Sequence, residues 1–576
     1  MTLDHRIRPS SREDGGVPDH AHPSPDSLIA TVRSSVIGAS ETIDGPFGRR
    51  PVIYADYTAS GRALTFIEDY LRDAVLPLYA NTHTESSQTG RHTTMLREEA
   101  RALVAAGVGA TDEHAVLFCG SGATGAIDKL VGVLGLRVPC TLDDRYHFTR
   151  QIPCEQRPVV FIGPYEHHSN ELPWRESIAD VVTIDEDSDG HVDLAHLRRE
   201  LERYADRPLL IGSFSAASNV TGILTDVASI ATMLHEFGAL SFWDYAAAAP
   251  YVQIEMSSAA EGNLAYLDAV FISPHKMVGG PGTPGVLVAR RELFANRVPD
   301  VPGGGTVRFV AAETHEYLPD IEAREEGGTP AIVDSIRAGL VFQLRDAVGV
   351  DTIRDHEERF ARAAIESWET NPAIDVLGSH DVDRLSIVSF IVRHGDRALH
   401  HNFVVAVLND VFGIQSRGGC SCAGPYGHRL LAIEPDESAR FQREIARGSE
   451  GIKPGWARVN FNYFFDRETF DYIVDAVHLV ATSGWRMLPW YTFDPSSGLW
   501  RHRDAVDGGV DGLHAVDYSS GAMAYPPVRH ERGAPLTEYL DAAREVLDAE
   551  PPPAIEPVPT SADFEALRWF AYPTDV

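Results

Sequence analysis

The segment FISPHKMVGGPGTPGVLVA, residues 271–289, decides how the chain folds and what chemistry it can perform. It begins as an apolar strand ending at Ser273, continues through His275 and Lys276, and enters a turn rich in glycine and proline. A lysine placed between a strand end and such a turn has its stem held by packing while its amine faces a cleft, and loss of water there lowers the amine pKa. The setting is typical of a lysine that forms an imine, although a solvated loop lysine fits the segment too.

Composition limits the classes of function. The chain has 576 residues, of which 44% are hydrophobic, so two or more domains with substantial cores are expected. With 50 basic and 83 acidic residues the net charge is −33, which argues against binding to nucleic acid or to an anionic membrane surface. Five cysteines do not make a disulfide framework, and no apolar run reaches the roughly 18 residues of a membrane span. The first fifty residues lack the apolar core of a secretory signal, so a cytoplasmic protein is expected.

Short apolar runs alternate with helical patterns between about residues 114 and 290. These runs are rich in β-branched residues and apolar on both faces, which favours a mostly parallel sheet covered by helices on both sides. Such sheets bind ligands at the carboxyl ends of their strands. The runs are AVLFC (115–119), PVVFIG (158–163), DVVTI (180–184), PLLIGSFS (208–215), ALSFW (239–243) and AVFIS (269–273).

The pattern changes along the chain and predicts four segments. Residues 1–50 contain many Pro, Ser, Asp and Gly and are expected to be a flexible arm. Residues 51–330 form the large α/β domain, and residues 331–485 form a smaller α+β domain. Residues 486–576 are expected to be a C-terminal appendage whose role the sequence leaves open, as it does for the charged insertion at 430–452.

Two features at strand ends could complete a site around Lys276. Asp244 ends the strand ALSFW, where its carboxylate could keep a pyridine nitrogen protonated; a helix cap or a turn is the alternative role. The loop GSGATG, residues 120–125, follows another strand and opens a helix. Its free backbone N–H groups and the Thr124 hydroxyl suit a phosphate. A glycine-rich turn that only lets the strand and helix pack closely is the alternative.

A pair of histidines follows a third strand in EHHSNELPW, residues 166–174. The imidazole of His167 could stack on a flat cofactor ring and move protons. Adjacent histidines also raise the possibility of zinc, but no second cluster with metal-ligand spacing occurs, so no metal is expected.

The loop SRGGCSCAG, residues 416–424, places two cysteines among three glycines. Backbone freedom would let a thiol move, and Arg417 would favour the thiolate form. Two inert buried cysteines or a metal-binding pair are the alternatives. Cys119, Cys140 and Cys154 lack such a setting and are interpreted as structural.

Taken together and in this order, these motifs resemble the class V aminotransferase and cysteine desulfurase family of fold-type I pyridoxal phosphate (PLP) enzymes. The chain looks most similar to the branch of cysteine desulfurases, selenocysteine lyases and molybdenum cofactor sulfurases. The resemblance extends from about residue 51 to 485. It is carried by YADYTAS (54–60), YANTH (79–83), EHHSNELPW, ASNVTG (217–222), SPHKMVGGPG (273–282), REEGGTP (324–330), RGGCSCAG (417–424) and ARVNF (457–461).

The resemblance implies a large domain with a seven-stranded, mostly parallel sheet, a smaller C-terminal domain, and a role for each matching residue. Lys276 would hold PLP as an imine, Asp244 would pair with the ring nitrogen, and His167 would stack on the ring and act in catalysis. Cys422 matches the sulfur-accepting cysteine of the family. Together with Cys420 it forms the CxC motif of the molybdenum cofactor sulfurase branch. The remaining implied cofactor ligands are Gly122, Ala123, Thr124, Asn219, Ser273, His275 and Thr329, and the implied substrate ligands are Asn81, His83, Asn219, Arg417 and Arg458.

The activity implied by the resemblance is removal of sulfur from L-cysteine or a related amino acid, through a persulfide on the enzyme, to give alanine. Thr329 would reach the phosphate of another subunit, which implies a homodimer, and a sulfur-acceptor protein or small molecule would be a further partner. An aminotransferase, an epimerase or a C–S lyase without persulfide chemistry is the alternative, and a non-catalytic binding protein on the same fold is another. Ala247 stands where the family usually has a glutamine that contacts the cofactor, and Thr84 stands where an arginine often follows the substrate-side loop.

Overall fold

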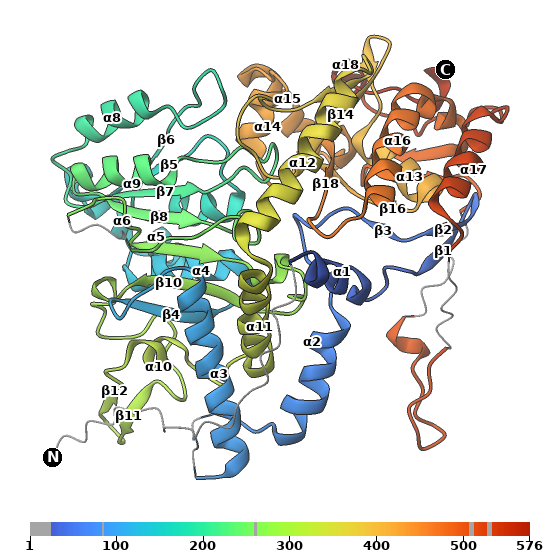
Figure 1. The fold of residues 1–576 in the computed structure, drawn as a ribbon. Coiled ribbons are helices and arrows are strands. Elements are labelled where there is room, and N and C mark those ends of the chain that lie inside the picture. Colours follow the sequence, from blue (N-terminus) through green and yellow to red (C-terminus); the bar gives the residue numbers. More distant parts are fainter. Residues whose placement is uncertain are drawn as a thin grey trace.

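The large domain is built on a seven-stranded sheet (Figure 1). The computed structural model describes residues 25–82, 84, 86–257, 262–505, 512–526 and 533–575. β10 is antiparallel to both of its neighbours, and the other neighbouring strands run parallel. The predicted α/β fold with a mostly parallel sheet is therefore confirmed. In spatial order the strands are β4 (His114–Cys119), β10 (Gly285–Arg290), β9 (Ala269–Ile272), β8 (Leu240–Asp244), β7 (Leu210–Ser215), β5 (Val159–Ile162) and β6 (Asp180–Thr183).

The sheet separates two apolar cores. Successive side chains of a strand point to opposite faces, so Leu117 joins one core while its neighbours Val116 and Phe118 join the other. Phe242 and Trp243 on β8 are divided in the same way. Because both faces are covered, these strands need apolar residues at nearly every position, as the sequence pattern indicated.

Helices cover the sheet, and two long ones pack against each other beside it. These are α3 (Gln88–Gly107) and α11 (Ile332–Val348), where Gly339 lies directly against Ala100. The other helices of this half are α2 (Thr65–Tyr70, continued by a π-turn Leu71–Val75), α4 (Gly122–Val133), α5 (Cys140–Tyr146), α6 (Phe148–Gln151), α7 (Leu172–Arg175), α8 (Leu194–Arg203), α9 (Val227–Glu236) and α10 (Ile321–Glu325). A hairpin of β11 (Val307–Val310) and β12 (His315–Tyr317) projects from the large domain.

The small domain lies beside the carboxyl ends of the large sheet (yellow to orange in Figure 1). Its antiparallel sheet has the order β13 (Ile374–Val376), β14 (Ile387–His394), β18 (Trp456–Asn460) and β17 (Arg417–Gly419), with β15 (Arg397–Ala398) paired to β14. Its helices are α12 (Val350–Glu369), α13 (His401–Phe412), α14 (Gly424–Leu430), α15 (Pro435–Ala446) and α16 (Arg467–Ser483).

The first strand of the 51–330 domain pairs with a strand of the small domain. β3 (Ile53–Tyr54) pairs in parallel with β16 (Ile414–Gln415), and the amide of Asn460 donates to the carbonyl oxygen of Ala55 at 2.9 Å. The residues that follow β3 are therefore held against β17 and β18, which brings them to the interface of the two domains.

The expectation of a flexible arm over residues 1–50 is wrong for residues 25–50, and residues 1–24 lie outside the described part. Residues 25–35 form α1 (Pro25–Ser35), whose Ile29 and Val32 are buried in the main core. Arg33 Nε donates to the carbonyl oxygen of Phe464 at 2.5 Å, and β1 (Thr42–Gly45) pairs with β2 (Gly48–Pro51). A short apolar stripe gains its stability from the surface on which it packs, so the polar composition misled the prediction.

The C-terminal segment is packed onto the small domain. β19 (Tyr491–Asp494) and β20 (Leu499–His502) form a hairpin, and α17 (Leu536–Asp548) lies against α13 and α16. α18 (Ala562–Leu567) contacts α15, so the 430–452 insertion and the chain end support each other. Phe570 is fully buried, and its ring lies edge-on to His400 with the centroids 4.6 Å apart. Within the described residues no helix is long and apolar enough to cross a membrane.

Candidate active site

A cavity of about 270 Å³ lies where the carboxyl ends of the large sheet meet the small domain. Twelve of the predicted site residues line it, although they come from seven separate parts of the chain. They are Gly122, Ala123, Thr124, His167, Asn219, Asp244, Ser273, His275, Lys276, Arg417, Cys422 and Arg458.

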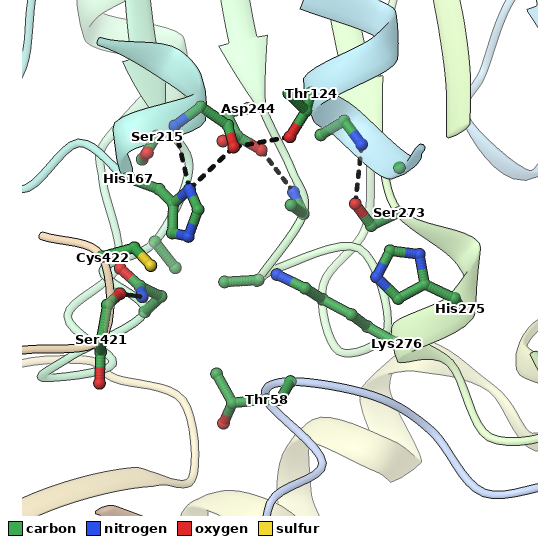
Figure 2. A pocket seen from close by; sticks show the side chains of 18 of the residues that line it. Thr58, Thr124, His167, Ser215, Asp244, Ser273, His275, Lys276, Ser421 and Cys422 are labelled. Carbon is green, nitrogen blue, oxygen red and sulfur yellow. Dashed lines mark hydrogen bonds between the residues drawn. The ribbon is translucent and has the colours of Figure 1, made fainter. Parts of the chain in front are cut away.

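Lys276 and Asp244 face the same cavity from neighbouring strands. β8 ends at Asp244 and pairs in parallel with β9, which is followed by the 3-10 turn Pro274–Lys276. Burial lowers the pKa of Lys276 to about 8, while the Asp244 carboxylate opposes that shift. Burial raises the pKa of Asp244, and the Ala246 amide, which donates to Asp244 Oδ1 at 2.8 Å, opposes it. Figure 2 shows the Lys276 amine reaching into the middle of the cavity.

An anion-binding surface is formed where α4 begins. Gly122 has a φ of +58°, and the Ala123 amide donates to Ser273 Oγ at 2.9 Å. A Cβ atom at position 122 would lie 2.8 Å from Ser273 Oγ and 2.7 Å from His275 Cε1, so only glycine leaves this corner open. Burial lowers the pKa of His275 to about 4, so its ring is neutral near pH 7. The N-terminus of α4 and the hydroxyl groups of Ser273 and Thr124, which line the same cavity, therefore suit a phosphate.

His167 is held as one tautomer. Its Nδ1 accepts from the Ser169 backbone amide at 3.1 Å and lies 3.0 Å from Ser169 Oγ, which is 2.6 Å from Thr124 Oγ1. Because a backbone N–H always donates, Nδ1 carries no proton and the neutral ring carries its proton on Nε2. Burial lowers the pKa of His167 to about 4, with the Lys276 charge adding to the effect. At neutral pH this ring can stack and donate a hydrogen bond from Nε2.

Glu166 is a buried acid beside this site that sequence reasoning missed. Its Oε1 accepts from the amide of Ser215 at 2.8 Å, and its Oε2 lies 2.6 Å from Ser215 Oγ and 2.7 Å from Asn170 Nδ2. Burial, with a smaller contribution from the nearby Asp244 charge, raises the pKa of Glu166 to about 7, while the hydrogen bonds from Ser215 and Asn170 oppose the shift. Ser215 lines the cavity, so this network supports the cavity wall from behind.

Asp56 joins the two predicted substrate arginines and was also missed. Its Oδ1 accepts from the Arg458 guanidinium at 2.9 Å, and its Oδ2 accepts from Arg417 Nε at 2.9 Å. Arg458 also donates to the carbonyl oxygen of Asn219 at 2.9 Å. Asp56 follows β3 in YADYTAS, and the pairing of β3 with β16 brings it to the domain interface.

The cysteine loop is anchored beside the cavity. The amide of His168 donates to the carbonyl oxygen of Cys422 at 2.8 Å, and Asn219 Nδ2 donates to that of Ser421 at 2.8 Å. Cys422 is exposed, and its sulfur faces His167 in Figure 2. Arg417 is engaged by Asp56, and Cys420 is partly buried against the core.

Two predicted residues, Asn81 and Thr329, lie away from this cavity. Asn81 Nδ2 donates to Thr329 Oγ1 at 3.4 Å, and both residues are exposed and do not line the cavity that contains Lys276. His83 lies outside the described residues. Among the described residues there is also no cluster of three His, Cys, Asp or Glu side chains that could hold a metal ion.

Buried polar atoms without a partner show that the cavity is built for a polar ligand. Thr58 is only 3% exposed, and its Oγ1 has no hydrogen bond; the Oδ1 of Asn219 is likewise unpaired. Leaving such a group unsatisfied costs about 1–3 kcal/mol, which a bound ligand would relieve. An amine, a carboxylate and an anion cradle around one cavity fit the aldehyde, the ring nitrogen and the phosphate of PLP.

A family model described as "Aminotransferase class-V" matches residues 53–441. The chain belongs to the class-V aminotransferase family. The match includes Lys276, Asp244 and Cys422 and ends before Arg458. Members of this family use PLP, so the protein is a PLP-dependent enzyme, and the residues described above fit that cofactor. Ala247, whose side chain cannot form a hydrogen bond, also lines the cavity.

Several known proteins are similar to this family member over about two thirds or more of its chain. A probable cysteine desulfurase from Mycobacterium leprae is 27% identical over 399 residues, which cover 68% of this chain and 88% of that protein. A cysteine desulfurase from Dickeya dadantii is 29% identical over 405 residues, which cover 69% of this chain and 88% of that protein. The fold is similar to the apo cysteine desulfurase of Thermococcus onnurineus, with a TM-score of 0.60 and 22% identity over 75% of this chain and 95% of that one.

Proposed function

We propose that this enzyme is a cysteine desulfurase that takes sulfur from L-cysteine, leaves it as a persulfide on Cys422, and releases alanine. The observation that carries the proposal is that the Cys422 thiol and the Lys276 amine line the same cavity. An aminotransferase or an epimerase needs the amine but has no use for the thiol. The relatives named as cysteine desulfurases support the same reaction.

The residues divide the chemical work. PLP, when bound, supplies an electron sink for negative charge at the substrate Cα. Arg458 and Arg417 bind the substrate carboxylate, and Asp56 keeps both guanidinium groups in place. Lys276 in its neutral form accepts the Cα proton, and Asp244 keeps a proton on the ring nitrogen. His167, fixed with its proton on Nε2, donates a hydrogen bond across the cavity.

Sulfur transfer then uses the loop thiol. The Cys422 thiolate attacks the sulfur of the substrate, so a new S–S bond forms while the Cβ–S bond breaks. The electron pair of the broken bond stays with Cβ, which takes up a proton and becomes the methyl group of alanine. The persulfide left on Cys422 faces the open side of the cavity, from which a thiol of an acceptor can remove the sulfur.

The test is to supply L-cysteine and a thiol reductant to the PLP-loaded enzyme and to measure alanine, pyruvate and sulfide. We expect equal amounts of alanine and sulfide, with both reduced at least 100-fold in Cys422→Ser and little changed in Cys420→Ser. Pyruvate as the main product would instead indicate a C–S lyase, and equal rates in wild type and Cys422→Ser would exclude the persulfide route.

We further propose that the enzyme acts as a homodimer in which Thr329 of one subunit contacts the phosphate in the other. Its support is the position of Asn81 and Thr329, which are exposed and lie away from the cavity of their own chain. Inactive Lys276→Ala and impaired Thr329→Ala proteins can be combined in hybrid dimers. If Thr329 acts across the interface, each hybrid contains one intact site and recovers half of the wild-type activity per dimer. If Thr329 acts within its own subunit, no activity is recovered.

We place the enzyme in a reducing compartment such as the cytoplasm. The five cysteines all remain free thiols in the structure, and a sulfur-accepting thiol needs a reducing environment to return to its starting state.

A further inference from the structure

We propose that His168, the second histidine of the EHH sequence, is a positioning residue that docks the Cys422 loop against the cavity. His168 contacts the loop at Cys422 itself and two residues after it. Its backbone amide donates to the carbonyl oxygen of Cys422 at 2.8 Å, and its ring Nε2 accepts from the amide of Gly424 at 3.2 Å. The inference rests on the proposed function, because a fixed position of the thiol matters most if Cys422 receives sulfur.

The loop needs such anchors because its backbone is strained. Ser421 has a φ of +53° and Cys422 a φ of +56°, a left-handed conformation that non-glycine residues rarely adopt. Each such residue costs about 1–2 kcal/mol, so two in succession persist only where the surroundings hold them. The Cys422 side chain is exposed and gains little from packing. Hydrogen bonds from His168 and Asn219 therefore help to hold the conformation, together with the burial of Ala423.

The docked conformation decides where the thiol points. With the loop held, Cys422 faces the cavity that contains Lys276 and lies beside His167 (Figure 2). Without the anchors, Ser421 and Cys422 would relax to negative φ values, which redirects the Cys422 side chain. Docking therefore favours attack of the Cys422 thiolate on the substrate.

The chemistry of the contact also fixes the state of the His168 ring. The Gly424 amide can only donate, so Nε2 must carry no proton and the neutral ring carries its proton on Nδ1. This is the reverse of the tautomer of His167, whose Nδ1 is the acceptor. Adjacent histidines thus have separate tasks: one faces the cofactor cavity and the other holds the loop.

The test compares His168→Phe, which keeps a ring of similar size without an acceptor, with His168→Gln, whose side-chain oxygen can replace Nε2. His428→Ala is the control, because His428 lies on α14 near the loop and contacts Ser438 outside the cavity. In PLP-loaded protein we expect amide hydrogen exchange in residues 419–424 to be about tenfold faster in His168→Phe, near wild type in His168→Gln, and unchanged in His428→Ala. Thermal unfolding shows that each variant is folded.

A second measurement separates positioning of the loop from general damage. Exchange of the Cα proton of L-alanine with deuterated water requires Lys276 and PLP but not the loop thiol. In His168→Phe we expect this exchange to stay within twofold of wild type, while alanine formation from L-cysteine falls about tenfold.

The outcomes distinguish this proposal from the proposed function. Unchanged amide exchange in His168→Phe, or equal losses of Cα-proton exchange and alanine formation, would overturn the role of His168. If the wild-type enzyme forms no alanine from L-cysteine while His168→Phe still loosens residues 419–424, loop docking stands and the desulfurase function fails.

Discussion

At the scale of single residues, the site depends on an amine that is partly uncharged near neutral pH. Burial lowers the pKa of Lys276 to about 8 from the ordinary value of 10.5, and the Asp244 carboxylate limits the shift. An ordinary lysine at pH 7.5 is neutral in about one molecule in a thousand, whereas this one is neutral in about a quarter of the molecules. That difference makes Lys276 a far better nucleophile toward an aldehyde.

The pH dependence of cofactor loading tests this. The rate at which the apo protein develops its visible absorption band with PLP is expected to rise through pH 7 and 8 and to level off above about pH 9, because half of the Lys276 amines are neutral at the pKa of about 8 and nearly all are neutral one pH unit higher. In Asp244→Asn the opposing charge is lost, so the midpoint moves to lower pH. A rate that keeps rising to pH 10 would mean that Lys276 titrates like a free lysine. Stopped-flow absorbance between pH 6.5 and 10 gives the profile.

At the scale of elements, α12 carries a buried acid that links it to the small-domain sheet. Glu357 is fully buried; its Oε2 lies 2.7 Å from Ser386 Oγ, and its Oε1 accepts from the Tyr463 amide at 3.1 Å. Burial raises the pKa of Glu357 to about 8, while these hydrogen bonds oppose the shift. The neutral acid can donate to Ser386 Oγ, which in turn donates to the carbonyl oxygen of Phe461.

This acid makes stability depend on pH in a defined direction. The folded state keeps the Glu357 proton up to about pH 8, whereas the unfolded chain loses it near pH 4.5, so the free energy of unfolding falls by about 1.4 kcal/mol per pH unit between these values. Glu357→Gln removes this titration and leaves the others in place. The stability of the variant relative to wild type is therefore expected to increase by about 2–3 kcal/mol from pH 6 to pH 8. Urea unfolding at both pH values measures it; a constant difference would mean that Glu357 is charged in the fold.

At the scale of the whole molecule, the chain end completes the small domain that carries Arg458 and Cys422. Phe570 lies among His400, Phe493 and Trp500, and its neighbour Trp569 donates from Nε1 to the carbonyl oxygen of Ile452 at 3.1 Å. A bridge between Ala398 and Phe570 adds backbone pairing beside β15. The described residues around Phe570 are therefore part of the core of the small domain.

Truncating the buried ring tests this dependence. Phe570→Ala is expected to lower the free energy of unfolding by about 3–5 kcal/mol, because a large buried side chain is replaced by a cavity. The matched control is Phe309→Ala on the β11–β12 hairpin, where the ring is 61% exposed and the expected change is within about 0.5 kcal/mol. Equal effects in urea unfolding would show that the C-terminal segment is not part of the cooperative fold.

The sequence predicted most of what depends on local pattern. Runs of β-branched and apolar residues predicted the sheet that β4 to β10 form, because strands covered on both faces must be apolar throughout. Polar residues directly after those strands, such as Asp244 and Lys276, were predicted to meet because the carboxyl ends of parallel strands share one edge. The polar composition of residues 25–50 misled, since α1 is stabilised by the surface beneath it.

By itself, then, the sequence determined the fold class and the residues that surround Lys276. Only the tertiary structure decided which groups act on those residues from far along the chain. Asp56 reaches Arg417 across 361 positions and Arg458 across 402, and His168 reaches Gly424 across 256. Such contacts depend on how two domains dock, and neither periodicity nor local spacing carries that information. The same docking gives Ser421 and Cys422 their left-handed backbone, which is why the direction of the thiol belongs to the folded molecule.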